Sequence, residues 1–301
     1  MHPIDLVIPY VNCDDPNWQA LYRQTLHRDF CSQRFRDYGT LLYQFRGIER
    51  HMPWIRRVYL IVQSQSQIPQ WLNTKHEKLK VVFHQDIIPQ EYLPVFKSTI
   101  IELHADRIDG LSENFILGND DFIPIKDLSP EEYFVDDRPV QKREDNPGMP
   151  VSSSDNIMQF VVYRMAVLER CYLQDLSFCG LKHCHLYIPY NKTFWRQILE
   201  RFKYSFGASF SESKYRGSLD LNHWLISDLQ ILNGLSVIND SLNTNGYIEL
   251  KDDTDESSIS PIIEQSKVIC MNDRVEYNFE KLNLAKKYLN ELLPDKSSFE
   301  R

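Results

Sequence analysis

The chain has 301 residues, 42% of them hydrophobic and 25% charged, with 34 Lys and Arg against 42 Asp and Glu. This length and composition predict one large or two small domains with a substantial core, and exclude disordered, collagen-like and disulfide-dense small proteins. The net charge of −8 argues against general nucleic-acid binding, which needs a strongly basic surface. Six cysteines without framework spacing predict reduced thiols in a cytoplasmic protein.

No membrane-spanning segment is expected. No run approaches the ~18 apolar residues that a bilayer requires, and no signal-peptide pattern precedes the first strand-like segment. We therefore expect any membrane association to be peripheral or to occur through a partner.

Apolar runs alternate with helical patterns through the first half of the chain. Such runs, apolar on both faces and separated by helices, predict an α/β fold with a mostly parallel sheet covered on both sides. Strands are expected at residues 5–11, 57–62, 80–83 and 114–117, and helices at 37–51 and 97–108.

The second half reads as mostly helical after a polar, proline-containing loop at 136–150. An acidic, serine-rich segment at 249–258 is expected to be a solvated loop, and a further strand is expected at 267–270. We divide the chain into parts 1–140 and 141–301 of one catalytic unit, with a strand at 267–273 that returns to the first part. Helices are expected at 157–168, 192–202, 219–232 and 278–293.

Each of the four expected strands of the first half ends in polar residues. In open α/β sheets, ligands bind in the crevice outside the carboxyl ends of the strands. Any one cluster is also compatible with a helix cap or a turn, but four together favour a binding site. The clusters are 12–15, 63–66, 84–86 and 118–121.

Adjacent carboxylates follow the fourth strand in Asn119-Asp120-Asp121. Carboxylates at a strand end suit a hard divalent cation, which would neutralise charge on a phosphate. The alternative is an ordinary turn. Asn272-Asp273 repeats the pattern after the strand near residue 270 and could complete the same site.

Cationic and histidine-rich segments supply further candidates. Arginines are concentrated between residues 23 and 57, and Arg216 precedes an expected helix, where a guanidinium can bind a phosphate with two hydrogen bonds. The alternative is a solvated surface cation.

The segment CGLKHCH at 179–185 is compatible with zinc, a histidine general base or a packed core histidine.

Several segments together resemble the Stealth family of bacterial capsular and exopolysaccharide phosphotransferases, which is similar to the catalytic subunit of N-acetylglucosamine-1-phosphotransferase. The resemblance covers most of the chain except residues 123–155 and 236–262. Its segments are IDLVIPYVNCDDPNW at 4–18, RFRDYGTLLYQFRGIERHMPWIRRVYLIV at 34–62, IPQWLN at 68–73, VVFHQDIIPQEYLPVFKSTIIELHADRIDGLSENFILGNDDF at 81–122, KYRGSLDLNHWLISDLQIL at 214–232, VICMND at 268–273 and LLPDKSSFE at 292–300.

This sequence departs from the family pattern at several positions. The family often has Gly at the position of Cys13, and Glu and Arg at those of Thr40 and Leu42. The loop after the second strand lacks the family's usual glycine. These departures bear on the identity of the sugar more than on the type of reaction.

The resemblance implies transfer of a hexose- or N-acetylhexosamine-1-phosphate from a UDP-sugar to a sugar hydroxyl of a growing polysaccharide or oligosaccharide, with release of UMP. It implies a Rossmann-like, glycosyltransferase-A-like sheet in 1–140 that binds the nucleotide sugar, and a helical acceptor and catalytic part in 141–301. It also implies a cytoplasmic enzyme, peripheral to a polysaccharide assembly complex at the inner face of the membrane.

The family's motifs assign roles to individual residues. His185 is the expected general base, with His183 as the competing choice, and Arg216 and Asp121 complete the catalytic set. Mg²⁺ or Mn²⁺ is expected on Asp120, Asp121 and Asp273. The donor half is expected to comprise Asn12, Asp15, Asp37, Tyr43, Arg46, His84 and Asp86.

Two other functions remain open from the sequence. One is a metal-dependent glycosyltransferase that forms a plain glycosidic bond and releases the nucleoside diphosphate. The other is an inactive sugar-binding homologue, suggested by the residues at Thr40 and Leu42.

Overall fold

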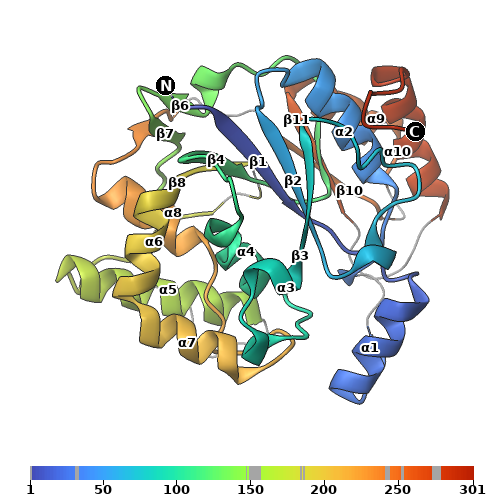
Figure 1. Ribbon diagram of the computed structural model, residues 1–301. Coiled ribbons are helices and arrows are strands. Elements are labelled where there is room, and N and C mark those ends of the chain that lie inside the picture. Colours follow the sequence, from blue (N-terminus) through green and yellow to red (C-terminus); the bar gives the residue numbers. More distant parts are fainter. Residues whose placement is uncertain are drawn as a thin grey trace.

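The protein is built around a five-stranded sheet in the order β3-β2-β1-β4-β8 (Figure 1). The computed structural model describes residues 2–30, 34–146, 148, 157–183, 185, 187–240, 245–251, 254–272 and 279–301. The first four strands in this order are parallel, and β8 is antiparallel to β4. The predicted α/β fold with a mostly parallel sheet is therefore confirmed. The strands are β1 (Ile4–Pro9), β2 (Arg57–Val62), β3 (Leu79–Phe83), β4 (Asn114–Leu117) and β8 (Ile188–Asn191).

Both faces of this sheet are buried. Successive side chains of each strand point to opposite faces, and most of them are apolar on both faces. Val7 and Tyr59 pack on one face, and Leu6 and Leu60 pack on the other. Figure 1 shows α4 to α8 on the first side, and α2 on the opposite side with the C-terminal helices. The helices are α2 (Thr40–His51), α4 (Ser98–Leu103), α5 (Ile157–Leu173), α6 (Lys192–Arg201), α7 (Lys203–Glu212) and α8 (Trp224–Leu232).

A second sheet, in the order β10-β11-β5, continues directly from the first. Its strand β5 (Phe122–Pro124) follows β4 after the turn at 118–121, and β11 (Val268–Asn272) pairs with it antiparallel. This pairing brings β11, from the last part of the chain, beside the turn that follows β4. The remaining elements are β10 (Asn245–Glu249), α9 (Glu256–Gln265), α10 (Phe279–Leu292), α1 (Pro16–Leu26), α3 (His84–Ile87), β6 (Phe134–Val135), β7 (Arg138–Gln141) and β9 (Val237–Ile238).

Several expected segments differ in the structure, and the helix expected at 219–232 begins only at Trp224. The helix expected at 97–108 ends at Leu103 and is followed by a 3₁₀ turn, Ala105–Arg107. The loop expected at 136–150 contains β7, whose polar Gln141 donates a buried hydrogen bond to Ser227 Oγ (2.9 Å). The loop expected at 249–258 contains the start of α9, because Asp255 caps that helix by accepting from Ser258 N.

The two parts of the chain share strand pairings. The second part supplies β8 to the sheet of the first, and β5 of the first part pairs with β11 of the second. The boundary at 140/141 stays a prediction. Among the described residues, no helix is long and apolar enough to cross a membrane.

A buried ion pair joins α4 to the loop between α7 and α8. Lys97 Nζ lies 2.5 Å from Asp220 Oδ1, and the two side chains are 0% and 2% exposed. Asp220 also accepts a hydrogen bond from Gly217 N (3.0 Å), while Phe96 N donates to Lys214 O (2.8 Å). The pair therefore fixes the loop that carries Arg216 against the start of α4.

We expect Lys97→Met to lower the free energy of unfolding by about 3–5 kcal/mol, because it leaves the buried Asp220 carboxylate without its positively charged partner. Urea denaturation measures this loss. The control is Lys203→Met, which breaks an ion pair whose side chains are 53% and 73% exposed and should cost less than about 1 kcal/mol. Equal losses in the two variants would contradict the structural role of Lys97.

Candidate active site

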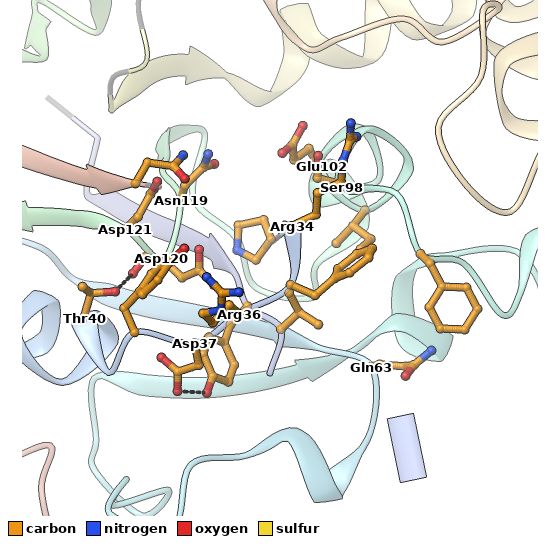
Figure 2. Close-up of a pocket in the computed structure, with 18 of the residues that line it drawn as sticks. Arg34, Arg36, Asp37, Thr40, Gln63, Ser98, Glu102, Asn119, Asp120 and Asp121 are labelled. Atoms are coloured by element: carbon orange, nitrogen blue, oxygen red, sulfur yellow. Dashed lines mark hydrogen bonds between the residues drawn. The ribbon is translucent and has the colours of Figure 1, made fainter. Parts of the chain in front are cut away.

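A cavity of about 250 Å³ opens where the parallel strands end (Figure 2). Its wall contains Tyr10 after β1, Gln63 after β2, His84 after β3 and the segment 119–121 after β4. Three of the four polar clusters therefore contribute to the lining, together with residues that the sequence places far away. The others are Pro9, Val11, Trp18, Arg34, Phe35, Arg36, Asp37, Tyr38, Thr40, Val95, Phe96, Ser98, Ile101, Glu102, His185, Arg216, Met271 and Asn272.

One side of the cavity is acidic, with Asp37, Asp120 and Asp121 around the same hollow (Figure 2). Burial and the neighbouring carboxylates of Asp121 and Asp37 raise the pKa of Asp120 well above its usual range. Asp37 is held by Tyr10 Oη (2.7 Å) and by Gly39 N (2.6 Å), both of which donate to it. Three carboxylates in this arrangement favour a bound cation.

The turn that carries these carboxylates is held by packing and hydrogen bonds. A Cβ on Gly118 would lie 2.3 Å from the Tyr187 ring, so only glycine fits there. Gln44 Nε2 donates to Asn119 O (2.8 Å), and Thr40 Oγ1 donates to Asp120 O (3.3 Å). Thr40, which departs from the family pattern, therefore supports the backbone of the acidic turn.

The acidic residues fit a hard divalent cation. Asp121 Oδ1 is buried and has no hydrogen-bond partner among the described residues, and a metal ion would satisfy it. Carboxylate oxygens are the ligands that Mg²⁺ and Mn²⁺ favour. Asp273, the third expected ligand, lies outside the described residues, although its neighbour Asn272 lines the cavity.

His185 lies beside this acidic group. Its Nε2 is 3.6 Å from Asp121 Oδ2 and 3.3 Å from Asn119 Nδ2, and its ring packs edge-on against Phe122 (centroids 4.7 Å apart). Burial lowers the pKa of His185, but the carboxylates of Asp121 and Glu102 outweigh it and leave the pKa above its ordinary value.

His183 lies in a different environment, outside the lining of this cavity. Its Nε2 is 2.7 Å from Asp228 Oδ2, and its ring stacks on Trp224. Burial lowers the pKa of His183 to about 4, so the ring is neutral near pH 7. The position of His183 is that of a packed histidine, whereas His185 faces the cavity.

The same cavity also contains cationic side chains. Arg216 and Arg34 both line it, and neither forms an ion pair or hydrogen bond with any residue that the structure describes. Burial and the nearby charge of Arg34 lower the pKa of Arg216. Glu102 and Asp220 act on Arg216 only through their charges, so its guanidinium keeps its hydrogen-bond donors for an anion such as a phosphate, and so does that of Arg34 among the described residues.

Glu102 of α4 is a buried carboxyl group that also lines the cavity. Nothing in the sequence pattern of this helix distinguishes it from an ordinary surface glutamate. Burial raises the pKa of Glu102 to about 7, against the opposing effects of Ser98, Arg216 and His185. Its Oε2 lies 3.8 Å from His223 Nε2, and Tyr190 Oη is 2.6 Å from the other ring nitrogen of His223. Glu102 therefore joins the cavity to a buried polar network.

Two donor-half residues after β1 lie outside the cavity lining. Asp15 caps α1, accepting from Ser66 Oγ (2.6 Å), Gln67 Nε2 (2.8 Å) and Asn17 N (3.0 Å). The Asn12 backbone exchanges two hydrogen bonds with the Gln67 side chain. In this structure both residues hold the start of α1, which places Trp18 in the cavity wall. Their direct contact with a donor stays a prediction.

Three further donor-half residues also lie outside the lining. Tyr43 Oη donates to Asn290 Oδ1 (2.7 Å), and Arg46 forms two hydrogen bonds to the Glu300 carboxylate (2.8 and 3.0 Å). Asp86 accepts from Phe83 N (2.8 Å) and caps the short helix α3. The structure brings together Asp37, His84, Asp120, Asp121, His185 and Arg216 from the expected set.

Comparisons with known proteins identify the family. Residues 34–142 match the family described as Stealth protein CR2, conserved region 2. The chain is 30% identical to the receptor polysaccharide phosphotransferase WefC of Streptococcus oralis, with 100% of both chains covered. The chain belongs to the Stealth family of phosphotransferases. It is also 28% identical to the capsular polysaccharide phosphotransferase WcwK of Streptococcus pneumoniae, with 99% of each covered.

A further Stealth relative is the exopolysaccharide phosphotransferase cps2G of Lactiplantibacillus plantarum, which is 28% identical over 99% of this chain and 96% of its own length. Among solved structures, the galactosyltransferase LgtC in complex with donor and acceptor sugar analogues is similar, with a TM-score of 0.47 and 12% identity over 98% of this chain and 96% of that one. A likeness of this size says nothing about the substrate of the Stealth protein.

We expect Asp120→Asn and Asp121→Asn each to weaken Mn²⁺ binding by at least about tenfold, because each removes a negative charge from the expected ligand set. Loss of the free Mn²⁺ electron paramagnetic resonance signal on titration measures the binding. Asp127→Asn is the control, since Asp127 is 92% exposed and pairs with His51 outside the cavity. Wild-type Mn²⁺ affinity in both cavity variants would refute a cation at this acidic group.

Proposed function

We propose that this Stealth phosphotransferase transfers a hexose- or N-acetylhexosamine-1-phosphate from a UDP-sugar to a sugar hydroxyl of a capsular polysaccharide or exopolysaccharide, with release of UMP. The observation that carries the proposal is that one cavity contains His185, the three aspartates and two arginines that form no ion pair with any described residue. The three relatives named above are polysaccharide phosphotransferases, which supports the acceptor class.

The proposed reaction is an in-line displacement at phosphorus. The acceptor hydroxyl oxygen forms a bond to the phosphorus that carries the sugar, and the bond from that phosphorus to the bridging oxygen breaks. UMP leaves with the bridging oxygen. Charge then develops on the oxygens of the transferred phosphate, and positioned cations stabilise it.

We assign the binding of the donor phosphates to Arg34 and Arg216. Arg216 lies in a loop that the buried pair of Lys97 and Asp220 fixes, so its backbone is positioned at the cavity before substrate arrives. Arg34 lies close enough for its charge to affect Arg216, and the two could bind oxygens of the same diphosphate. Asp120 and Asp121 would hold Mg²⁺ or Mn²⁺, which when bound supplies further neutralisation of the diphosphate.

We assign the acceptance of the hydroxyl proton to His185. Its Nε2 faces the cavity, and Asp121 and Glu102 favour the protonated form that results. Phe35, which is partly exposed in the lining and is backed by the buried Trp18, offers an apolar surface to the uracil base. The cytoplasmic location and the association with a polysaccharide assembly complex stay predictions.

We expect His185→Ala to lower kcat by about 10²–10⁴-fold with little change in donor binding, because the variant loses the base but keeps the arginines. Single-turnover kinetics and donor titration measure the two quantities. His183→Ala is the matched comparison, two residues away and outside the cavity lining. If His183→Ala is inactive while folded and His185→Ala is active, the base must be reassigned.

With a panel of UDP-sugars and a polysaccharide acceptor, we expect one UMP for each sugar phosphate transferred and a phosphodiester resonance in the phosphorus NMR spectrum of the product. The reason is that attack at phosphorus separates the two phosphates of the donor. Release of UDP with a phosphorus-free product would establish a glycosyltransferase instead. Absence of donor turnover with the whole panel would favour the inactive sugar-binding homologue.

A further inference from the structure

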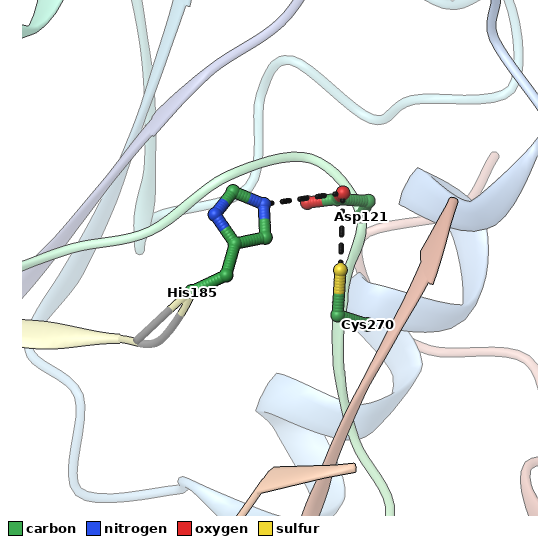
Figure 3. Close-up of side chains that lie close together, drawn as sticks. All are labelled: Asp121, His185 and Cys270. Atoms are coloured by element: carbon green, nitrogen blue, oxygen red, sulfur yellow. Dashed lines mark hydrogen bonds and ion pairs between the residues drawn. The ribbon is translucent and has the colours of Figure 1, made fainter. Parts of the chain in front are cut away.

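Three side chains of unlike chemistry converge at one edge of the cavity (Figure 3). They are the Asp121 carboxylate, the His185 imidazole and the Cys270 thiol, each with one donor atom within 4.8 Å of the other two. Cys270 donates to Asp121 Oδ2 over 3.2 Å, and His185 Nε2 lies 3.6 Å from the same oxygen. The proposed reaction gives Cys270 no task.

We propose that Asp121, His185 and Cys270 form a binding site for one thiophilic divalent cation of the Zn²⁺ type, and that an ion bound there blocks the enzyme by capturing His185. Thiolate and imidazole donors favour such ions over Mg²⁺. The blocking part rests on the proposed role of His185 as base, whereas the binding part does not.

The distances between the donor atoms suit a tetrahedral ion. With zinc–ligand bonds of about 2.0–2.3 Å, neighbouring donor atoms are separated by about 3.3–3.5 Å. The separations of 3.2 and 3.6 Å are close to these values, and the third pair is within 4.8 Å. A small movement of His185 would therefore complete three ligands and leave the fourth position for water from the cavity.

The backbone fixes two of the three ligands before any ion binds. Cys270 on β11 is the register partner of Phe122 on β5, the residue directly after Asp121, and Met271 N donates to Asp121 O (3.3 Å). The His185 ring packs on the same Phe122. Because two ligands are already in place, binding an ion requires the repositioning of His185 alone.

The surroundings also favour a cation. Asp120 and Asp37 lie nearby, and Asp121 Oδ1 has no hydrogen-bond partner among the described residues. One oxygen of Asp121 can thus bind the thiophilic ion, while the other can bind a cation held together with Asp120. The side chain of His185 is 40% exposed, so an ion can reach the site from the cavity.

An ion at this site would oppose the proposed chemistry directly. Its bond to His185 uses the Nε2 lone pair that would otherwise accept the proton of the acceptor hydroxyl. Its bond to Cys270 releases the thiol proton to solvent. Trace zinc should therefore inhibit the enzyme even when Mg²⁺ is present in excess.

Cobalt spectroscopy tests the binding without relying on activity. One equivalent of Co²⁺ added to the metal-free protein should produce a thiolate-to-cobalt charge-transfer band and the intense visible absorption of tetrahedral cobalt, and Zn²⁺ should abolish both. Cys270→Ser should lose the charge-transfer band and weaken Zn²⁺ binding by about 100-fold or more. Cys171→Ser is the control, because Cys171 is a free and exposed cysteine on α5.

A second variant guards against misfolding of Cys270→Ser. His185→Asn changes a loop residue and should keep the charge-transfer band while losing the visible intensity of the tetrahedral ion. Absence of the band in the wild-type protein, or its loss in Cys171→Ser alone, would overturn the site. Stoichiometric binding with full transferase activity in Zn²⁺ would overturn the blocking role and the assignment of His185 as base, but would leave the metal site established.

Discussion

The parallel pairing of β1 with both β2 and β4 is the constraint on which the rest of the structure depends. Because these strands run in the same direction, their carboxyl ends lie at one edge of the sheet. Residues that follow three separate strands therefore reach a common cavity. The pairing also buries the strands on both faces, which is why their sequences are mostly apolar, with Asp5, Arg57 and Asn114 at their amino ends and polar clusters after their carboxyl ends.

The cavity contains side chains of opposite charge. Asp37, Asp120 and Asp121 repel one another, and Arg34 and Arg216 do the same. Arg34 and Arg216 form no ion pair with these aspartates, although a third arginine, Arg36, lies beside Asp37 and Asp120 in the lining (Figure 2). A diphosphate together with a divalent cation would compensate both sets at once, which explains how an acidic chain can favour an anionic donor.

Packing behind the cavity wall positions both sets of charges. The buried pair of Lys97 and Asp220 fixes the loop of Arg216, and the contact of Gly118 with Tyr187 fixes the turn of Asp121. Tyr187 comes just before β8, and Asp220 lies between α7 and α8, so both supports come from the second half of the chain. The acidic turn and the arginine loop are thus positioned by contacts between segments that are distant in sequence.

The sequence by itself determined the α/β class, the main parallel strands and the polar clusters at their ends, because alternation and burial on both faces are local patterns. The family segments also pointed to Asp120, Asp121, His185 and Arg216, which the structure brings to one cavity.

Only the tertiary structure separated His185 from His183, since two residues in one loop can face different surroundings. It also decided the places of Glu102, Arg34 and Cys270, as well as those of Tyr43 and Arg46 outside the cavity wall. A helical pattern does not show which of its polar residues faces a cavity, and the register of β11 on β5 depends on pairing between residues almost 150 positions apart.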